Sequence, residues 1–168
     1  MATTFTLISS VTVGSGGASS IDFTSIPATY TDLVLKASLR GTTAATVVGS
    51  NIKFNSTTTG YSSRYIAGDG ASASSGTITS NYLADINAAN NTASTFTNME
   101  IYIPNYASSN NKSLSVDSVQ EQNGTTAYSE MWAILWSNTA AITSISLVPA
   151  SNNFAQYSTA YLYGIKNS

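Results

Sequence analysis

The 168-residue chain predicts a single all-β domain, a jelly roll or a related antiparallel β-sandwich of about eight to ten strands. Apolar residues recur at every second position and not at the helical spacing. The many Thr, Val, Ile and Tyr residues favour strands over helices. Turn signals separate short segments at the spacing of a sandwich. No repeat, linker or charge run divides the chain, so residues 1–168 are predicted to form one domain.

In the N-terminal part, the first candidate strand covers residues 4–13 and ends at the glycine-rich turn 14–17. A short strand at 20–23 and a longer one at 32–40 follow. The longer segment alternates most clearly. Its inward side chains are expected to be Leu33, Leu35, Ala37 and Leu39, and its outward ones Lys36, Ser38 and Arg40.

The middle of the chain predicts five further candidate strands and two loops. The candidate strands are 51–55, 62–66, 77–86, 96–104 and 112–120. The polar stretches 71–75 and 87–95 are expected to be surface loops. Within 96–104, Met99, Ile101 and Ile103 alternate with Asn98, Glu100 and Tyr102.

The C-terminal part holds the most apolar segment, residues 129–137, which follows a strong turn signal at Asn123-Gly124. Apolar side chains occupy both faces of this segment, so we expect a strand that is covered twice. The last two candidate strands are 143–148 and 158–166. Tyr161 and Tyr163 share a face with Ile165, which predicts that both lie in the core.

Charge is scarce. Charged residues make up 8% of the chain, against about 25% in ordinary soluble domains, while Ser, Thr and Asn supply 66 of the 168 residues. A β surface with few charges can be covered by neighbours at low desolvation cost, which favours assembly; a surface adapted to a saline setting is the alternative. The six Lys and Arg residues are scattered, so a nucleic-acid surface is not expected. The sequence predicts neither a membrane span nor a signal peptide.

The chemistry-bearing residue types are few. The chain has no His and no Cys, which excludes Ser-His-Asp and Cys-His arrangements and ordinary zinc sites. Asp117, Glu121 and Glu130 flank one predicted hairpin and are the best candidates for a glycosidase carboxylate pair. Solvated turn and edge carboxylates are the preferred interpretation. We therefore expect no enzyme activity, catalytic residue, cofactor or metal.

Aromatic residues are the more promising candidates for contacts, since the chain has ten Tyr and two Trp residues. The candidate assembly contacts are Tyr102, Tyr106, Trp132 and Trp136. The alternative is that such rings fill the sandwich core.

Four segments together resemble a family. They are TFTLISSVTVGSGGASSIDFTSIPATYTDLVLKASLR, TNMEIYIPNYASSNNKSLSVDSV, SEMWAILWSNTAAITSISLVP and STAYLYGIKNS. The stretch at 26–33 and the closing 162–166 carry most of the likeness. The chain resembles small virion proteins of tailed bacteriophages, especially those of marine and cyanobacterial hosts.

This resemblance implies a structural protein on the surface of the virion, assembled in the host cytoplasm as a homo-oligomer, with a trimer expected. The leading hypothesis is a capsid decoration (cement) protein that binds the major capsid protein or another virion protein and its own copies. A tail or fibre module that binds a host surface glycan is the alternative. No catalytic residues come with the likeness.

Overall fold

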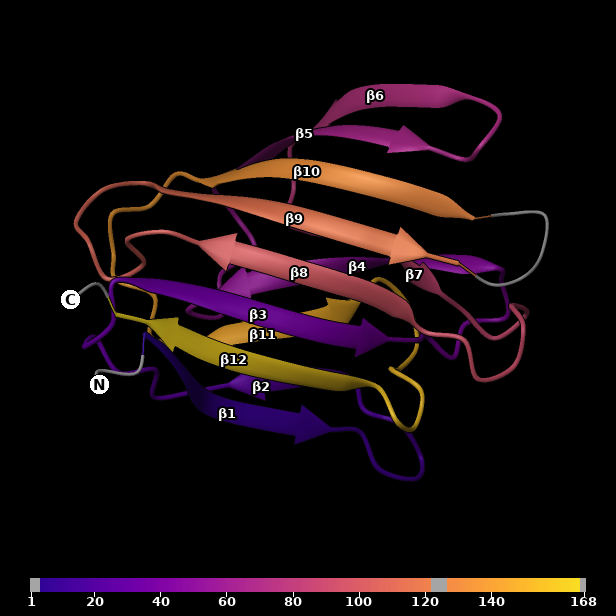
Figure 1. Cartoon of the computed structure of the whole chain (residues 1–168), viewed down its shortest axis with the longest axis horizontal. Helices are drawn as coiled ribbons and strands as arrows, with labels where there is room; N and C mark the ends of the chain where they lie inside the picture. Colours follow the sequence, from indigo (N-terminus) through magenta and orange to yellow (C-terminus); the bar gives the residue numbers. More distant parts are fainter. Residues whose placement is uncertain (1–3, 122–126, 167–168) are drawn as a thin grey trace.

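Every regular element is a β-strand in the computed structural model, which describes residues 4–121 and 127–166 (Figure 1). The strands form two antiparallel sheets. The described residues contain no helix long and apolar enough to cross a membrane. The all-β sandwich predicted from the sequence is therefore confirmed, with twelve strands instead of eight to ten.

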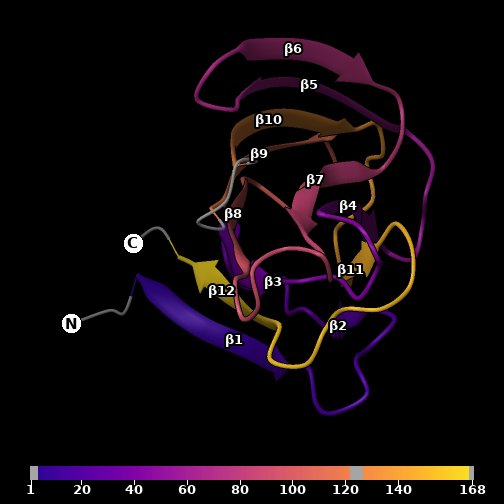
Figure 2. The same cartoon turned by 90° about the vertical axis from the view of Figure 1, so that its right-hand side faces the viewer.

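The larger sheet has eight strands. In spatial order they are β1 (Phe5–Thr12), β12 (Thr159–Ile165), β3 (Asp32–Leu39), β8 (Thr97–Ile103), β9 (Lys112–Gln120), β10 (Tyr128–Trp136), β5 (Tyr61–Gly68) and β6 (Ala73–Ile78). The smaller sheet has four, in the order β2 (Ile21–Phe23), β11 (Ile145–Pro149), β4 (Val47–Phe54) and β7 (Tyr82–Asn87). Figure 2 shows the larger sheet curving around the smaller one.

Eight of the strands have jelly-roll connectivity. A jelly roll pairs its first, eighth, third and sixth strands in one sheet and its second, seventh, fourth and fifth in the other. The orders β1-β12-β3-β8 and β2-β11-β4-β7 reproduce this arrangement. The hairpins β5–β6 and β9–β10 are insertions into it, and they lie side by side in the larger sheet as β9-β10-β5-β6. We call these four inserted strands the wing.

The core lies between the two sheets. Side chains alternate between buried and exposed along β8 and β9, as strand geometry requires. The expected inward side chains Leu33, Leu35 and Leu39 are fully buried, and Ala37 is nearly so. The alternation assigned to residues 96–104 is likewise confirmed, with Ile101 and Ile103 fully buried and Met99 nearly so.

Three details differ from the sequence-based expectations. Arg40, expected to point outward, is buried, because its guanidinium donates to carbonyl groups in the loop between β7 and β8. Residues 73–75, expected in a loop, belong to β6, because pairing with β5 holds these small polar residues in a strand. The segment 77–86 is not one strand, since β6 ends at Ile78 and β7 begins at Tyr82. The turn expected at Asn123-Gly124 lies outside the described residues.

The wing is joined to the smaller sheet by a corner of aromatic and carboxylate side chains. The Trp132 ring stacks on Tyr65 at a centroid distance of 4.5 Å and meets Tyr82 at 5.2 Å. The buried Glu130 carboxylate accepts hydrogen bonds from Trp132 Nε1 at 3.1 Å and from the backbone N–H of Asp85 at 3.3 Å. Since Asp85 lies on β7, Glu130 satisfies a donor at the free edge of the smaller sheet.

Candidate contact surface on the larger sheet

The outer face of the larger sheet, which points away from the smaller sheet, is the candidate contact surface. Register pairs Tyr102 with Ser115, Ser115 with Ala133, and Ala133 with Arg64, so these four side chains form one row across β8, β9, β10 and β5. With neighbouring strands about 4.8 Å apart, the ends of this row are about 14 Å apart at Cα. Two small side chains therefore lie between two long ones.

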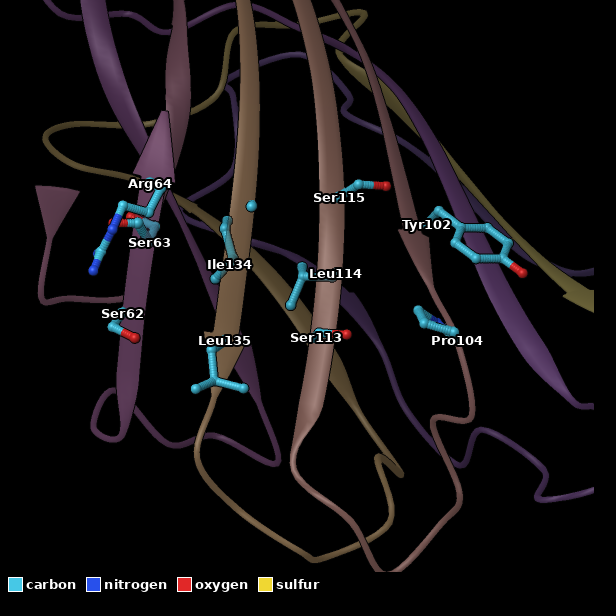
Figure 3. A pocket seen from close by; sticks show the side chains of 11 residues that line it. Ser62, Ser63, Arg64, Tyr102, Pro104, Ser113, Leu114, Ser115, Ile134 and Leu135 are labelled. Atoms are coloured by element: carbon cyan, nitrogen blue, oxygen red, sulfur yellow. The ribbon is translucent and has the colours of Figure 1, made fainter. Parts of the chain in front are cut away.

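This row forms part of a shallow groove of about 550 Å³ (Figure 3). Arg64 and Tyr102 stand at its two sides, and small side chains lie between them. The groove is lined by Ser62, Ser63, Arg64, Tyr102, Pro104, Ser113, Leu114, Ser115, Ala133, Ile134 and Leu135. The groove exists because Ser and Ala occupy outward positions where longer side chains would fill the space.

Next to the groove, an apolar ridge crosses the wing. Met131 and Ile66 are directly paired on β10 and β5, and their side chains are 59% and 60% exposed. Val119 on β9 is 42% exposed, and its Cα partner is Ser129, two residues before Met131. We call Ile66, Val119 and Met131 the ridge. The three exposed apolar side chains make the ridge a candidate contact site.

The outer face as a whole collects the exposed apolar surface of the described residues. Eight large hydrophobic side chains are exposed, and seven of them lie on this face. Those seven are Phe5, Leu7, Ile66, Tyr102, Val119, Met131 and Tyr161. The eighth, Tyr157, lies in the loop before β12. The ridge was not predicted from the sequence, although Met131 lies at an outward position of β10 that the alternation of the segment identifies.

Charge on the same face is sparse and balanced. Lys36 and Glu100 form an ion pair at 2.8 Å between directly opposed positions of β3 and β8. Arg64 and Asp117 add one exposed charge of each sign, and the Asp32 carboxylate on the same face is buried. Both members of the ion pair are about half exposed, so it contributes little to stability. The face is therefore weakly charged and close to neutral.

Tyr102 is the one aromatic contact candidate from the sequence that reaches this surface. It is 36% exposed, and its hydroxyl donates a hydrogen bond to Asp32 at 2.7 Å. This bond to a carboxylate raises the pKa of the Tyr102 hydroxyl. The ring is thus fixed at one side of the groove.

The other three aromatic candidates are buried, so their side chains are not available for surface contacts. Tyr106 is fully buried, and its hydroxyl donates to the carbonyl of Pro27. Trp136 is buried against Phe54, and Trp132 belongs to the corner described above. These three rings therefore fill the core, which was the alternative interpretation of the sequence.

The prediction that Tyr161 and Tyr163 lie in the core was wrong. Tyr161 is exposed, Tyr163 is partly exposed, and both point outward from β12. Strand 129–137 is covered on one face only within the subunit, since its outward Met131 is exposed. A second cover for β10 would have to come from another molecule.

The carboxylates proposed for hydrolysis do not form a facing pair. Asp117 is exposed on the outer face of β9, whereas Glu130 is buried on the inner face of β10. Burial raises the pKa of Glu130, and the nearby Asp85 carboxylate adds to the effect. Glu121 follows β9 and is exposed. A sheet therefore separates Asp117 from Glu130, in contrast to the shared cleft of a glycosidase.

Comparisons with known proteins add no relative. No family model, curated protein or solved structure matches the chain. The described residues also contain no group of three or more acidic side chains that could hold a metal ion. The structure itself defines the class: a jelly-roll sandwich with an inserted wing and an apolar, nearly neutral outer face.

Proposed function

We propose that this protein is a structural protein of a tailed-phage particle that decorates the capsid, binding the major capsid protein and its own copies. The observation that carries the proposal is the concentration of exposed apolar side chains on the outer face of the larger sheet. Burial of apolar surface contributes about 25 cal/mol per Å². A small stabilisation at each contact is repeated at every copy on the shell.

The ridge supplies the test. The double substitution Ile66→Lys and Met131→Lys places two cations on exposed positions of the wing, where folding does not require the apolar side chains. We expect at least a tenfold loss of binding to phage particles that lack the protein, measured by co-sedimentation. The matched control is Thr24→Lys with Ser25→Lys, at exposed positions after β2 of the smaller sheet, and should bind as the unaltered protein does.

The position on the particle gives an independent check. Electron microscopy of particles carrying the protein should place it on the capsid surface, and particles without it should lose resistance to heat. Equal binding by the Lys variant, or unchanged heat resistance without the protein, would contradict the proposal.

A tail or fibre module that binds a host glycan is the second candidate, and the groove favours it. Ser62, Ser113 and Ser115 line the groove with hydroxyl groups, and Arg64 adds a cationic donor. Labelling of the tail tip, together with glycan-array binding that Arg64→Ala abolishes, would support this function over capsid decoration.

A further inference from the structure

The edges of the two sheets differ in how they are protected. An edge strand exposes a row of unpaired backbone N–H and C=O groups, and folded proteins usually block such rows with charges, bulges, short strands or covering segments. The sandwich has four edges: β1 and β6 on the larger sheet, and β2 and β7 on the smaller.

Three of these edges carry a recognisable block. Strand β2 has three residues and includes Asp22. The Glu130 carboxylate binds the free edge of β7 through the N–H of Asp85. In β1, the register with β12 shifts between Leu7 and Ser9, as at a β-bulge, which interrupts regular pairing on both sides of the strand.

Strand β6 has none of these blocks. It pairs with β5 in unbroken register over six residues, from Ala73 opposite Gly68 to Ile78 opposite Ser63. Its sequence, ASSGTI, contains no charge and no proline. Within the described part of the chain, no strand pairs with its other side. Such an edge is a template for another strand.

We propose that β6 pairs with β6 of a second copy of this chain, antiparallel about a two-fold axis perpendicular to the sheet. The two larger sheets then join into one continuous sheet, with both outer faces on the same side. Closed two-fold contacts are the commonest homo-oligomeric arrangement. A second copy has the same unprotected edge, so one interface pairs the free backbone N–H and C=O groups of both copies.

The side chains of β6 suit such a contact. Because both outer faces lie on one side, outward residues must oppose outward residues, and the outward residues of β6 are Ala73, Ser75 and Thr77. Several registers meet this condition, and two of them pair the largest number of β6 residues. One places Ser75 opposite Ser75 of the second copy, and the other places Ser75 opposite Thr77 of the second copy. These side chains are small, so neither register causes a clash.

This arrangement differs from the ring of three that the phage resemblance implies. A ring needs a head-to-tail contact between two different surfaces. If the edges of the larger sheet formed that contact, β6 of one copy would pair with β1 of the next. The register shift in β1 disfavours that contact. The two-fold contact uses the regular edge twice, and it does not depend on the proposed capsid function.

The first test is the oligomeric state. Ser75→Lys with Thr77→Lys puts cations at two exposed outward positions of β6, where like charges meet in either register. Analytical ultracentrifugation should show a dimer for the unaltered protein and at least a tenfold higher dimer dissociation constant for the variant. The control Ser10→Lys with Thr12→Lys makes the same change on exposed residues of β1 and should remain dimeric. Circular dichroism checks that all forms are folded.

The second test uses the absence of cysteine from the chain. Directly opposed residues of antiparallel strands lie about 4.5–5.5 Å apart at Cα, within disulfide reach. Ser75→Cys, or Ser75→Cys with Thr77→Cys for the alternative register, should give a covalent dimer under oxidised glutathione, whereas Thr12→Cys should not. A monomer at all concentrations, a trimer sensitive to lysines on both edges, or cross-linking through Thr12→Cys alone would overturn the proposal.

Discussion

Several glycines of the sandwich lie beneath aromatic rings, where even one added methyl group meets the ring. A Cβ at Gly164 would lie 2.3–2.5 Å from ring atoms of Tyr30, and one at Gly49 would lie 2.6 Å from the Tyr82 ring. Gly76 has the same relation to Tyr65, at 2.8 Å. Glycine at these positions therefore allows a ring to pack directly on a strand.

We expect Gly164→Ala to lower the free energy of unfolding by about 1–3 kcal/mol, because the added Cβ overlaps the body of the Tyr30 ring. Urea unfolding followed by fluorescence measures the change. The matched control is Gly14→Ala, since no atom lies within 4 Å of a Cβ at that position. A Gly164→Ala protein as stable as the Gly14→Ala protein would contradict the packing described here.

Glu130 gives the fold a pH dependence. Burial raises its pKa in the folded protein above the ordinary value of 4.5, so the folded state binds the proton more tightly than the unfolded state does. Protonated Glu130 contributes fully to the free energy of unfolding when the pH is below its pKa in the unfolded chain. This contribution is lost as the pH rises through its pKa in the folded protein. We expect Glu130→Gln to remove this part of the decline, measured as the free energy of unfolding between pH 4 and pH 8. The exposed substitution Glu100→Gln should leave the decline in place.

At the scale of elements, a single arginine organises the loop between β7 and β8. The buried Arg40 donates through Nη1 to the carbonyls of Thr92 and Thr95, both at 2.8 Å, and through Nη2 to that of Asn91 at 2.9 Å. Burial lowers its pKa, and no carboxylate of the described residues lies within ion-pair distance of it. The planar fork of five N–H donors suits several carbonyls at once.

Arg40→Lys should therefore loosen this loop although it preserves the charge. A lysine ammonium cannot reach carbonyls in the same fork geometry, so we expect a loss of about 1–3 kcal/mol in stability and faster hydrogen exchange across residues 88–95. Exchange measured by mass spectrometry on peptides from this loop tests the expectation. Arg64→Lys, at an exposed position of β5, is the control, and equal exchange in the two variants would count against the role of Arg40.

The elements also show where sequence reasoning succeeds. The inward residues predicted for β3 and the alternation predicted for β8 are correct, because one face of each segment is mainly apolar. The prediction for β3 was incomplete, since Val34 on its outer face is buried as well. For β12, alternation gave the wrong inward face. Ala160 and Leu162 are apolar on one face and Tyr161 and Tyr163 are aromatic on the other, so alternation cannot decide which face is buried. Strand β6 has too few apolar residues to be recognised before its pairing with β5 is known.

At the scale of the whole molecule, the candidate surface extends over both parts of the larger sheet: four of its seven exposed hydrophobic side chains lie on jelly-roll strands, and the three of the ridge lie on the wing. The ridge lies entirely on inserted strands, as does most of the groove. The sequence alone could not separate inserted strands from jelly-roll strands, because both alternate in the same way. Buried rings such as Trp136 were also predicted to be assembly contacts, because residue type does not specify which side of a sheet a ring faces.

The charge balance of the outer face leads to a prediction about how the molecule associates. The exposed charges of this face are two of each sign, Lys36, Arg64, Glu100 and Asp117, so screening has little net attraction to remove. Binding through apolar contacts should change less than about threefold between roughly 0.05 and 0.5 M NaCl, and sulfate should strengthen it. Co-sedimentation of the protein with phage particles that lack it, over this salt range, tests the point. A steep linear fall of affinity with salt would instead identify an electrostatic contact made elsewhere on the surface.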